Sequence, residues 1–174
     1  VKKYHKPAEM VGLDFSAKAV ALCNEFYKIP GLRFMQGDAE NLPFDDNSFD
    51  AVINVESSHC YGSVDAFLGQ VRRVLRPGGY FLYADFRDQV KMDTWRQQIR
   101  DSGLTLVNET DITKNVVAAL DADDERKTEL INKLVPKLLL SSFKDFSGVK
   151  GSAIYNEFRS GVTPYVRFLL QKPK

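Results

Sequence analysis

The sequence contains few of the residues that build disulfide bonds, metal sites or membrane spans. Two cysteines and two histidines occur among its 174 residues. Cys23 and Cys60 lie in unlike contexts, which predicts free thiols in a reducing, cytoplasmic compartment. His5 and His59 are far apart, and no metal-ligand cluster surrounds either of them. No apolar run reaches the roughly 20 residues that a helix needs to cross a bilayer.

The sequence also lacks a net charge large enough to indicate a polyanionic partner. Lys and Arg number 24 against 23 Asp and Glu, a net charge of +1, so we expect no nucleic-acid partner. Hydrophobic residues make up 44%, which argues against disorder, and the length suits one domain. The chain begins at Val1 rather than Met and has no apolar signal region. We therefore expect part of a longer protein without a secretory leader.

Strand-like and helix-like segments alternate over the first 110 residues. Short apolar or alternating stretches predict strands at residues 10–14, 32–36, 49–54, 80–85 and 104–108. Apolar positions with helical spacing predict helices at residues 16–28, 64–75 and 91–102. Such alternation is the signature of parallel βαβ units. We predict an α/β fold with a doubly wound, mostly parallel sheet, and residues 1–110 form its core.

Residues 111–162 differ from this core and predict a helical insertion. Several apolar residues recur on one helical face: Leu130, Ile131, Leu134, Val135, Leu138 and Leu139. Pro136 should bend or break this helix, because its ring removes a donor and clashes with the preceding turn. The apolar face fits either a substrate lid or a helix buried against the sheet. Residues 163–174 should add a final strand to the same sheet, which makes the chain a single domain.

Acidic residues follow two of the predicted strands. Asp14 ends the first strand, where a carboxylate can accept hydrogen bonds from both hydroxyls of a ribose. Asp38 lies in the polar turn after the second strand. There it can accept from an adenine amine while the backbone N–H of Ala39 meets a ring nitrogen. Each acid has a simpler interpretation as a turn or capping residue. Acids at two successive strand ends favour ligand binding.

Four short runs together resemble one enzyme family. The runs are VGLD at 11–14, GDAENLPF at 37–44, SFD at 48–50 and LRPGG at 75–79. They resemble class I S-adenosylmethionine-dependent methyltransferases over about residues 9–85. The run NVESSHCY at 54–61 is most similar to members that methylate lipid and polyketide hydroxyls, of the mycobacterial phthiotriol/phenolphthiotriol dimycocerosate type. The resemblance implies a Rossmann-like fold, S-adenosyl-L-methionine as cofactor, and a small-molecule or lipid-like methyl acceptor.

The resemblance also implies roles for individual residues in a cofactor-binding core. It assigns Asp14 to the ribose and the side chain of Phe15 to a wall near the adenine. Asp38 and Ala39 would meet the adenine edge. Asn54 would form the floor beneath the methionine portion.

One part of the family pattern has no counterpart in the sequence. The family's first strand and its Gly-rich turn, which hold the methionine end of the cofactor, should precede Val1. In the family's sheet this strand lies between the strands that end at Asp14 and at Asn54. Its absence predicts open edges on both neighbours, which can support strand exchange or a homo-oligomer. We also expect this chain alone to bind the cofactor poorly.

The segment after the third strand holds the candidate catalytic residues. His59 is the candidate general base for a hydroxyl acceptor, because histidine titrates near neutral pH. A loop histidine that only makes a local hydrogen bond is the alternative. Glu56 can orient His59 or balance a sulfonium charge, or it is an exposed loop acid. Tyr61 either lines the acceptor pocket or packs as an aromatic. Cys60 is not expected to act as a nucleophile, because adjacent residues rarely face each other.

The sequence therefore predicts a methyltransferase, or a fragment of one, acting on a small-molecule or lipid-like hydroxyl. A nicotinamide-dependent oxidoreductase is the alternative from another enzyme class. The turn Asp38-Ala39-Glu40 disfavours it, as does the lack of a Tyr-x-x-x-Lys pair. A truncated, non-catalytic binding or oligomerising module is the third possibility, and the missing Gly-rich strand favours it.

Overall fold

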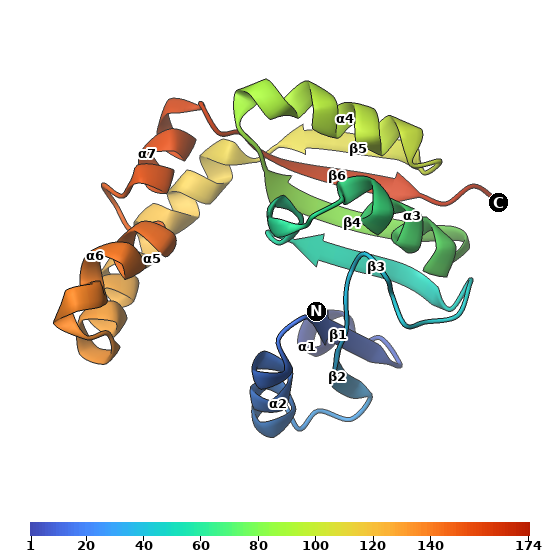
Figure 1. Cartoon of the computed structure of the whole chain (residues 1–174), viewed down its shortest axis with the longest axis horizontal. Helices are drawn as coiled ribbons and strands as arrows, with labels where there is room; N and C mark the ends of the chain where they lie inside the picture. Colours follow the sequence, from blue (N-terminus) through green and yellow to red (C-terminus); the bar gives the residue numbers. More distant parts are fainter.

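The computed structural model describes the backbone of residues 1–174 and every side chain except those of Lys3, Lys137, Ser141 and Asp145. The described strands form two separate sheets, one of two strands and one of four. A lobe of helices extends away from the larger sheet (Figure 1).

The smaller sheet belongs to the N-terminal part of the chain. This part comprises α1 (Lys2–His5), β1 (Met10–Asp14), α2 (Ala17–Phe26) and β2 (Leu32–Gln36). β1 and β2 pair in parallel, with Met10 opposite Leu32. Ser16 caps α2, because its side chain accepts a hydrogen bond from the N–H of Ala19 at 3.3 Å.

The larger sheet has the strand order β3-β4-β6-β5. Its strands are β3 (Phe49–Val55), β4 (Leu75–Phe86), β5 (Thr105–Asp111) and β6 (Tyr165–Gln171). β3 and β4 are parallel, whereas β6 is antiparallel to both β4 and β5. The register of β3 and β4 shifts beside the Pro-Gly-Gly turn. A Cβ on Gly79 would lie 2.9 Å from the carbonyl oxygen of Arg76 and 3.0 Å from that of Asp50. Glycine is therefore required where the strands converge.

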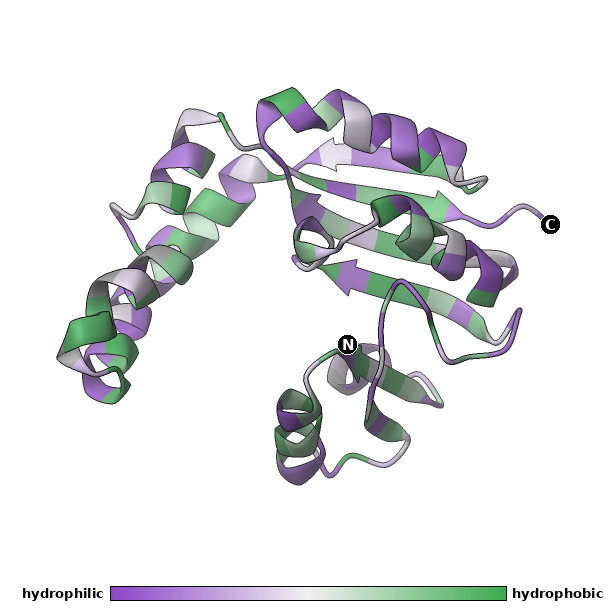
Figure 2. Cartoon of the chain, in the orientation of Figure 1, coloured by the Kyte–Doolittle hydropathy of each residue, from purple (hydrophilic) through white to green (hydrophobic). Residues whose placement is uncertain are grey.

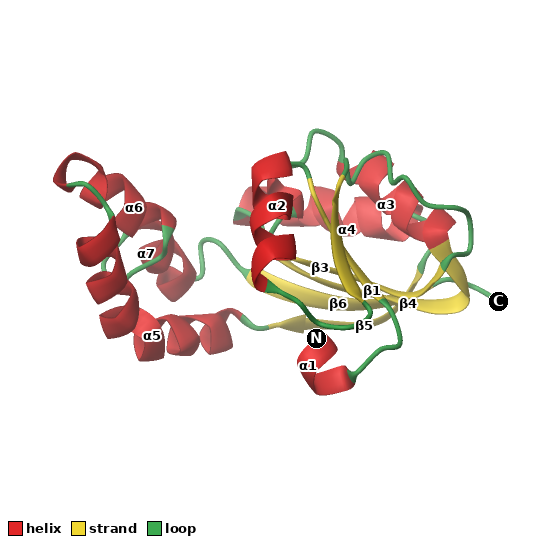
Figure 3. Cartoon of the chain, turned by 90° about the horizontal axis from the view of Figure 1, so that it is seen from below, coloured by secondary structure: helices red, strands yellow, loops and turns green.

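Two helices cover one face of the larger sheet (Figure 3). They are α3 (Val64–Val74) and α4 (Met92–Asp101), preceded by the 3-10 turns η1 (Ser58–Cys60) and η2 (Gln89–Lys91). α3 begins after Ser63, whose Oγ accepts from the N–H of Ala66 at 3.1 Å. α3 buries a stripe with helical spacing: Phe67, Leu68, Val71 and Val74. This stripe packs on an aromatic core that includes Phe81, Tyr83, Trp95 and Phe168.

The opposite face and two edges of the sheets are open among the described residues. Ile53, Val55, Tyr80 and Leu82 are each more than 40% exposed. β1 pairs only with β2, and β3 pairs only with β4. The predicted open edges are therefore present on the strands that end at Asp14 and next to Asn54.

The helical lobe spans residues 113–160. It comprises α5 (Thr113–Leu134), η3 (Lys137–Leu139), α6 (Leu140–Phe146) and α7 (Ala153–Ser160). α5 ends just before Val135 and Pro136, so the proline stops the helix as predicted. Of the apolar residues predicted to share one face, only Ile131 is buried. The lobe is therefore not a helix buried against the sheet (Figure 2).

The predicted α/β class with a helical insertion before the last strand is confirmed. β4 begins at Leu75 rather than at Tyr80, because the Pro-Gly-Gly turn continues into the strand. The division into a core, a substrate lid and a final strand of one domain stays a prediction. Where the chain is described, no helix is both long and apolar enough to cross a membrane.

Candidate active site

The loop after β2 and the segment after β3 are joined by hydrogen bonds. Oε1 of Glu40 accepts from the N–H of Gly62 at 2.7 Å. Arg73 of α3 donates to the carbonyl oxygens of Leu42 at 2.8 Å and Phe44 at 2.6 Å. These bonds hold the loop after β2 against the segment after β3. The carboxyl ends of β2 and β3 therefore lie on the same side of the molecule. Ligands bind at that side in open α/β sheets.

Asp14 and Phe15 are exposed at the end of β1. Oδ1 of Asp14 accepts from the N–H of Ser16 at 2.7 Å, as in a turn that opens a helix. Its second carboxylate oxygen has no hydrogen-bond partner among the described residues. The side chain of Phe15 is 78% exposed. Both side chains are thus available to a ligand beyond the strand.

Asp38 also stabilises its own turn. Its Oδ1 accepts from the N–H of Glu40 at 2.8 Å, and its carbonyl accepts from the N–H of Asn41 at 3.1 Å. Its Oδ2, like that of Asp14, is unpaired where side chains are described. Ala39 is partly buried and packs against the hydrophobic core. Asp14 and Asp38 can therefore each stabilise a turn and also bind a ligand. One carboxylate oxygen accepts from a nearby backbone N–H, and the other oxygen is unpaired.

Asn54 presents a buried acceptor that has no donor. Its Nδ2 donates to Oγ of Ser57 at 2.8 Å and to the hydroxyl of Tyr61 at 2.9 Å. Its Oδ1 is the one buried side-chain nitrogen or oxygen atom without a hydrogen-bond partner in the described part of the chain. Leaving such an acceptor unpaired costs about 1–3 kcal/mol. A donor supplied by a bound ligand would remove this cost.

His59 and Asp85 form a hydrogen-bonded pair at the carboxyl ends of β3 and β4. Nδ1 of His59 lies 2.8 Å from Oδ1 of Asp85. The Asp85 side chain is fully buried, whereas that of His59 is 27% exposed. The His59 ring also stacks on Phe86, with centroids 4.4 Å apart. When Nδ1 donates to the carboxylate, Nε2 is the nitrogen that can accept a proton.

The Asp85 carboxylate is held ionised by several partners. Its Oδ2 accepts from Oγ of Ser58 at 2.6 Å and lies 3.3 Å from the Arg87 guanidinium. Burial raises the pKa of Asp85. Hydrogen bonds from Ser58, His59 and the Phe86 N–H, together with the charge of Arg87, outweigh this effect and hold the pKa below its ordinary value.

Further buried contacts fix the position of this carboxylate. Nη2 of Arg87 donates to Oγ of Ser58 at 2.8 Å, and Oγ of Ser58 also hydrogen-bonds the Tyr83 hydroxyl. Trp95 donates to that hydroxyl at 2.9 Å, and Arg87 stacks on the Trp95 ring at 4.5 Å. Burial raises the pKa of Tyr83, which keeps its hydroxyl neutral. The network is rigid, because every member is paired.

Glu56 does not orient His59. It adopts a left-handed conformation with φ of 54°, and its Oε2 accepts from the hydroxyl of Tyr165 at 3.2 Å. Burial, followed by the charge of Glu56, raises the pKa of Tyr165. The carboxylate that orients His59 is Asp85 instead, because it is the one that hydrogen-bonds Nδ1.

Tyr61 contacts the protein with both its ring and its hydroxyl. The ring meets Phe67 edge-on at 5.0 Å. The hydroxyl accepts from Asn54 and lies 3.0 Å from Oγ of Ser57. Tyr61 is thus a packing aromatic that also holds the Asn54 amide in place.

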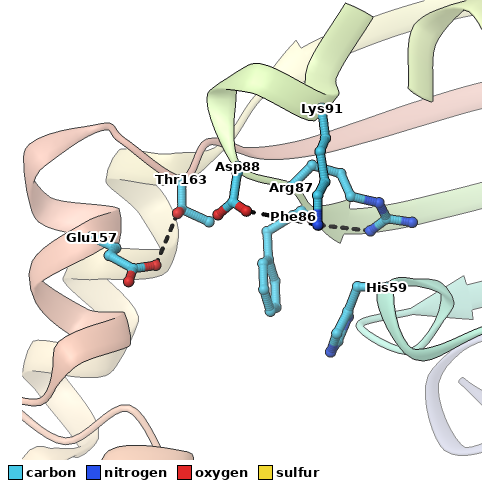
Figure 4. A pocket seen from close by; sticks show the side chains of 7 residues that line it. All are labelled: His59, Phe86, Arg87, Asp88, Lys91, Glu157 and Thr163. Atoms are coloured by element: carbon cyan, nitrogen blue, oxygen red, sulfur yellow. Dashed lines mark hydrogen bonds and ion pairs between the residues drawn. The ribbon is translucent and has the colours of Figure 1, made fainter. Parts of the chain in front are cut away.

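A cavity of about 140 Å³ lies beside His59 (Figure 4). Its lining residues are His59, Phe86, Arg87, Asp88, Lys91, Glu157 and Thr163. Glu157 belongs to α7, so the helical lobe supplies part of one wall. The volume suits a small reacting group, since sites for larger ligands measure roughly 300–1,000 Å³. No cluster of metal-binding side chains occurs in the described part of the chain.

Comparison with known proteins identifies the class of domain. Residues 1–83 match the family described as methyltransferase domain. Over 166 residues the chain is 37% identical to the phthiotriol/phenolphthiotriol dimycocerosates methyltransferase of Mycobacterium tuberculosis, covering 95% of the chain and 62% of that relative. It is also 37% identical over 168 residues to the fatty-acid O-methyltransferase of Mycolicibacterium smegmatis, covering 97% and 61%.

A solved structure supports the fold. The StiE O-MT superimposes with a TM-score of 0.76 at 22% sequence identity, covering 99% of this chain and 62% of that one. The fold is therefore that of Rossmann-like methyltransferases. The chain spans about three-fifths of the length of the curated relatives that it matches.

The residues present fit one half of the cofactor that this family implies, S-adenosyl-L-methionine. Asp14 and Asp38 each keep an unpaired carboxylate oxygen beyond a strand end, which suits the ribose and adenine donors. The buried Oδ1 of Asn54 suits a donor on the methionine portion. The family's Gly-rich turn has no counterpart among these residues.

Sequence reasoning did not single out Asp85, Ser58 or Arg87. Asp85 carried a usable signal, because it ends a predicted strand as Asp14 does. Ser58 and Arg87 carried none, since their roles depend on side chains that meet only in the folded protein.

Proposed function

We propose that the chain is the larger part of an S-adenosyl-L-methionine-dependent methyltransferase that acts on a hydroxyl of a lipid-like acceptor. The observation that carries this proposal is the pair formed by Nδ1 of His59 and the buried Asp85 at 2.8 Å, beside a cavity at the strand ends. Two relatives are named for phthiotriol dimycocerosates and for fatty acids. These names support a lipid-like acceptor.

The cofactor-binding residues in this proposal lie at three strand ends. Asp14 accepts from the ribose hydroxyls, and Phe15 lines the adenine. Asp38 and the backbone of Ala39 meet the adenine edge. Asn54 accepts from the methionine ammonium group. When bound, the cofactor supplies an electrophilic methyl group on a sulfonium sulfur.

His59 acts as the general base in this proposal. Its Nε2 accepts the proton of the acceptor hydroxyl as the oxygen attacks in line. Asp85 holds the ring and stabilises the positive charge that His59 acquires. General-base catalysis of this kind contributes about 10²–10⁴-fold. The paired Arg87 and Ser58 keep the carboxylate in place throughout.

Glu56 and Tyr61 complete the proposed site. Glu56, held by Tyr165, offers a negative charge near the sulfonium. Tyr61 borders the acceptor side and positions Asn54 through its hydroxyl.

Isothermal titration with S-adenosylhomocysteine tests the cofactor proposal. We expect weak or undetectable binding to the 174-residue chain, and clear binding to a form extended upstream of Val1 by a strand and a Gly-rich turn. Asp14→Ala and Asp38→Ala should each weaken binding to the extended form by about tenfold, the effect of one lost charge-assisted hydrogen bond.

Asp50→Ala is the matched control. Asp50 pairs with Arg76 at 2.6 Å on the exposed surface, away from the proposed ligand. Its loss should leave binding unchanged. No binding to the extended form would refute the methyltransferase proposal, and micromolar binding to the short chain would refute the importance of the Gly-rich turn.

A further inference from the structure

The tip of the helical lobe, residues 130–146, exposes large apolar side chains far from the cavity at His59. Leu138 is 94% exposed, Phe146 is 89% exposed and Leu134 is 68% exposed. Three further apolar side chains of the tip are about half exposed: Leu130, Leu139 and Phe143. Figure 2 shows hydrophobic ribbon gathered at this end of the lobe. Exposed apolar side chains grouped in this way mark an interaction surface.

Positive charge is concentrated around the same tip. The tip itself, residues 130–146, contains three Lys and one Asp, a net charge of +2 in a chain whose total net charge is +1.

A shallow hollow on α5 brings the two kinds of side chain together. Arg126, Glu129, Leu130 and Lys133 line it, and its volume is about 240 Å³. Arg126 is paired with Asp123 at 2.6 Å. Lys133 is exposed and forms no ion pair with a described acid, so it is the cation available to an incoming anion.

An apolar tip with a basic margin matches the boundary between lipid headgroups and hydrocarbon. Apolar side chains enter the acyl region there, while Lys and Arg meet anionic headgroups. A protein partner or a second copy of this chain would also cover apolar residues. The exposed apolar side chains together with the net positive charge of the tip favour an anionic lipid surface as the occupant, and self-association is an outcome of the test.

We propose that residues 130–146 dock the protein on an anionic lipid bilayer. Leu134, Leu138 and Phe146 enter the interface, and Lys133 meets the headgroups. The proposal stands independently of methyl transfer.

Vesicle flotation tests this surface. The protein is mixed with phosphatidylcholine vesicles, or with vesicles of phosphatidylcholine and phosphatidylglycerol at about 3:1. We expect binding that is stronger on the anionic vesicles. Leu138→Ser with Phe146→Ser should lower partitioning by about tenfold or more, because it removes two exposed apolar side chains that would enter the acyl region. Lys133→Glu should lower it by about fivefold, on anionic vesicles alone.

The matched control is Phe26→Ser with Val90→Ser. These two apolar side chains are 74% and 86% exposed and lie outside the lobe. The control pair should leave partitioning unchanged, and circular dichroism should show that all variants keep their helix content. Equal losses for the control pair and the tip pair would overturn the proposal. So would unchanged binding of the tip pair, or light scattering that shows a dimer dispersed by the tip substitutions without any vesicle binding.

Discussion

The side chains of His59 and Asp85 meet at 2.8 Å, although His59 follows β3 and Asp85 lies near the end of β4. β3 and β4 are parallel neighbours, so their carboxyl ends lie side by side. The buried Asp85 carboxylate is charged. The partly exposed imidazole of His59, which lines the cavity, shields this carboxylate from it. This pairing makes both the stability and the proposed chemistry depend on Asp85.

Replacing Asp85 with Asn should destabilise the fold at neutral pH. The substitution leaves Arg87 buried without its charge partner, which costs about 3 kcal/mol. The pKa of Asp85 is lowered by folding, so its contribution is fully present above the unfolded pKa of about 3.9 and is lost progressively as the pH falls from there through the lower folded pKa. Urea unfolding at pH 7 and pH 3 should show a larger difference between the two proteins at pH 7 than at pH 3.

Asp88→Asn is the control for this measurement. Asp88 is 55% exposed and lies 3.9 Å from Lys91, so its loss should change stability by less than about 0.5 kcal/mol. A deficit for Asp85→Asn that is equal at both pH values would contradict the assignment.

Replacing His59 with Gln should slow methyl transfer. We expect a fall in kcat of about 10²–10⁴-fold in a cofactor-binding form of the protein, with the affinity for S-adenosylhomocysteine unchanged. Transfer from radiolabelled cofactor to a long-chain hydroxylated lipid measures the fall in kcat. A variant that keeps full turnover across pH would exclude His59 as the base.

Two glycines give a matched test of backbone packing. Gly79→Ala places a Cβ 2.9 Å and 3.0 Å from backbone oxygens, so it should destabilise the protein by about 1–3 kcal/mol. Gly69→Ala, in the middle of α3 with no atom within 4 Å of the new Cβ, should stabilise it by up to about 1 kcal/mol. Thermal melting of both variants checks the opposite signs. Shifts in the same direction would show that the turn beside β3 can relax.

Replacing Asn54 with Leu should weaken the binding of S-adenosylhomocysteine while changing the free energy of unfolding little. The substitution removes the buried Oδ1 that lacks a donor, and it also removes the bonds to Ser57 and Tyr61. These effects oppose each other, so the free energy of unfolding should change by less than about 1.5 kcal/mol. Affinity for S-adenosylhomocysteine in the extended form should fall by about tenfold. Tyr61→Phe, which keeps the ring, should lower affinity less; an equal or larger loss would argue against a direct role for Oδ1.

Local pattern was enough to predict most elements. Alternation and helical spacing placed β1, β2 and α3 within a residue of their observed ends, because the pattern that identifies each segment is contained within it. Ser16 caps α2 and Pro136 stops α5, as predicted. Both effects depend only on the adjacent backbone.

The sequence by itself determined the class of fold and the acids at the strand ends. Both follow from short-range periodicity and from motifs contained in single segments. Tertiary structure decided which side chains pair. His59 hydrogen-bonds Asp85 rather than Glu56, and Glu56 hydrogen-bonds Tyr165. The buried Oδ1 of Asn54 has no partner. These pairings join residues that are distant in the chain, so they depend on strand register and on burial that no local pattern records.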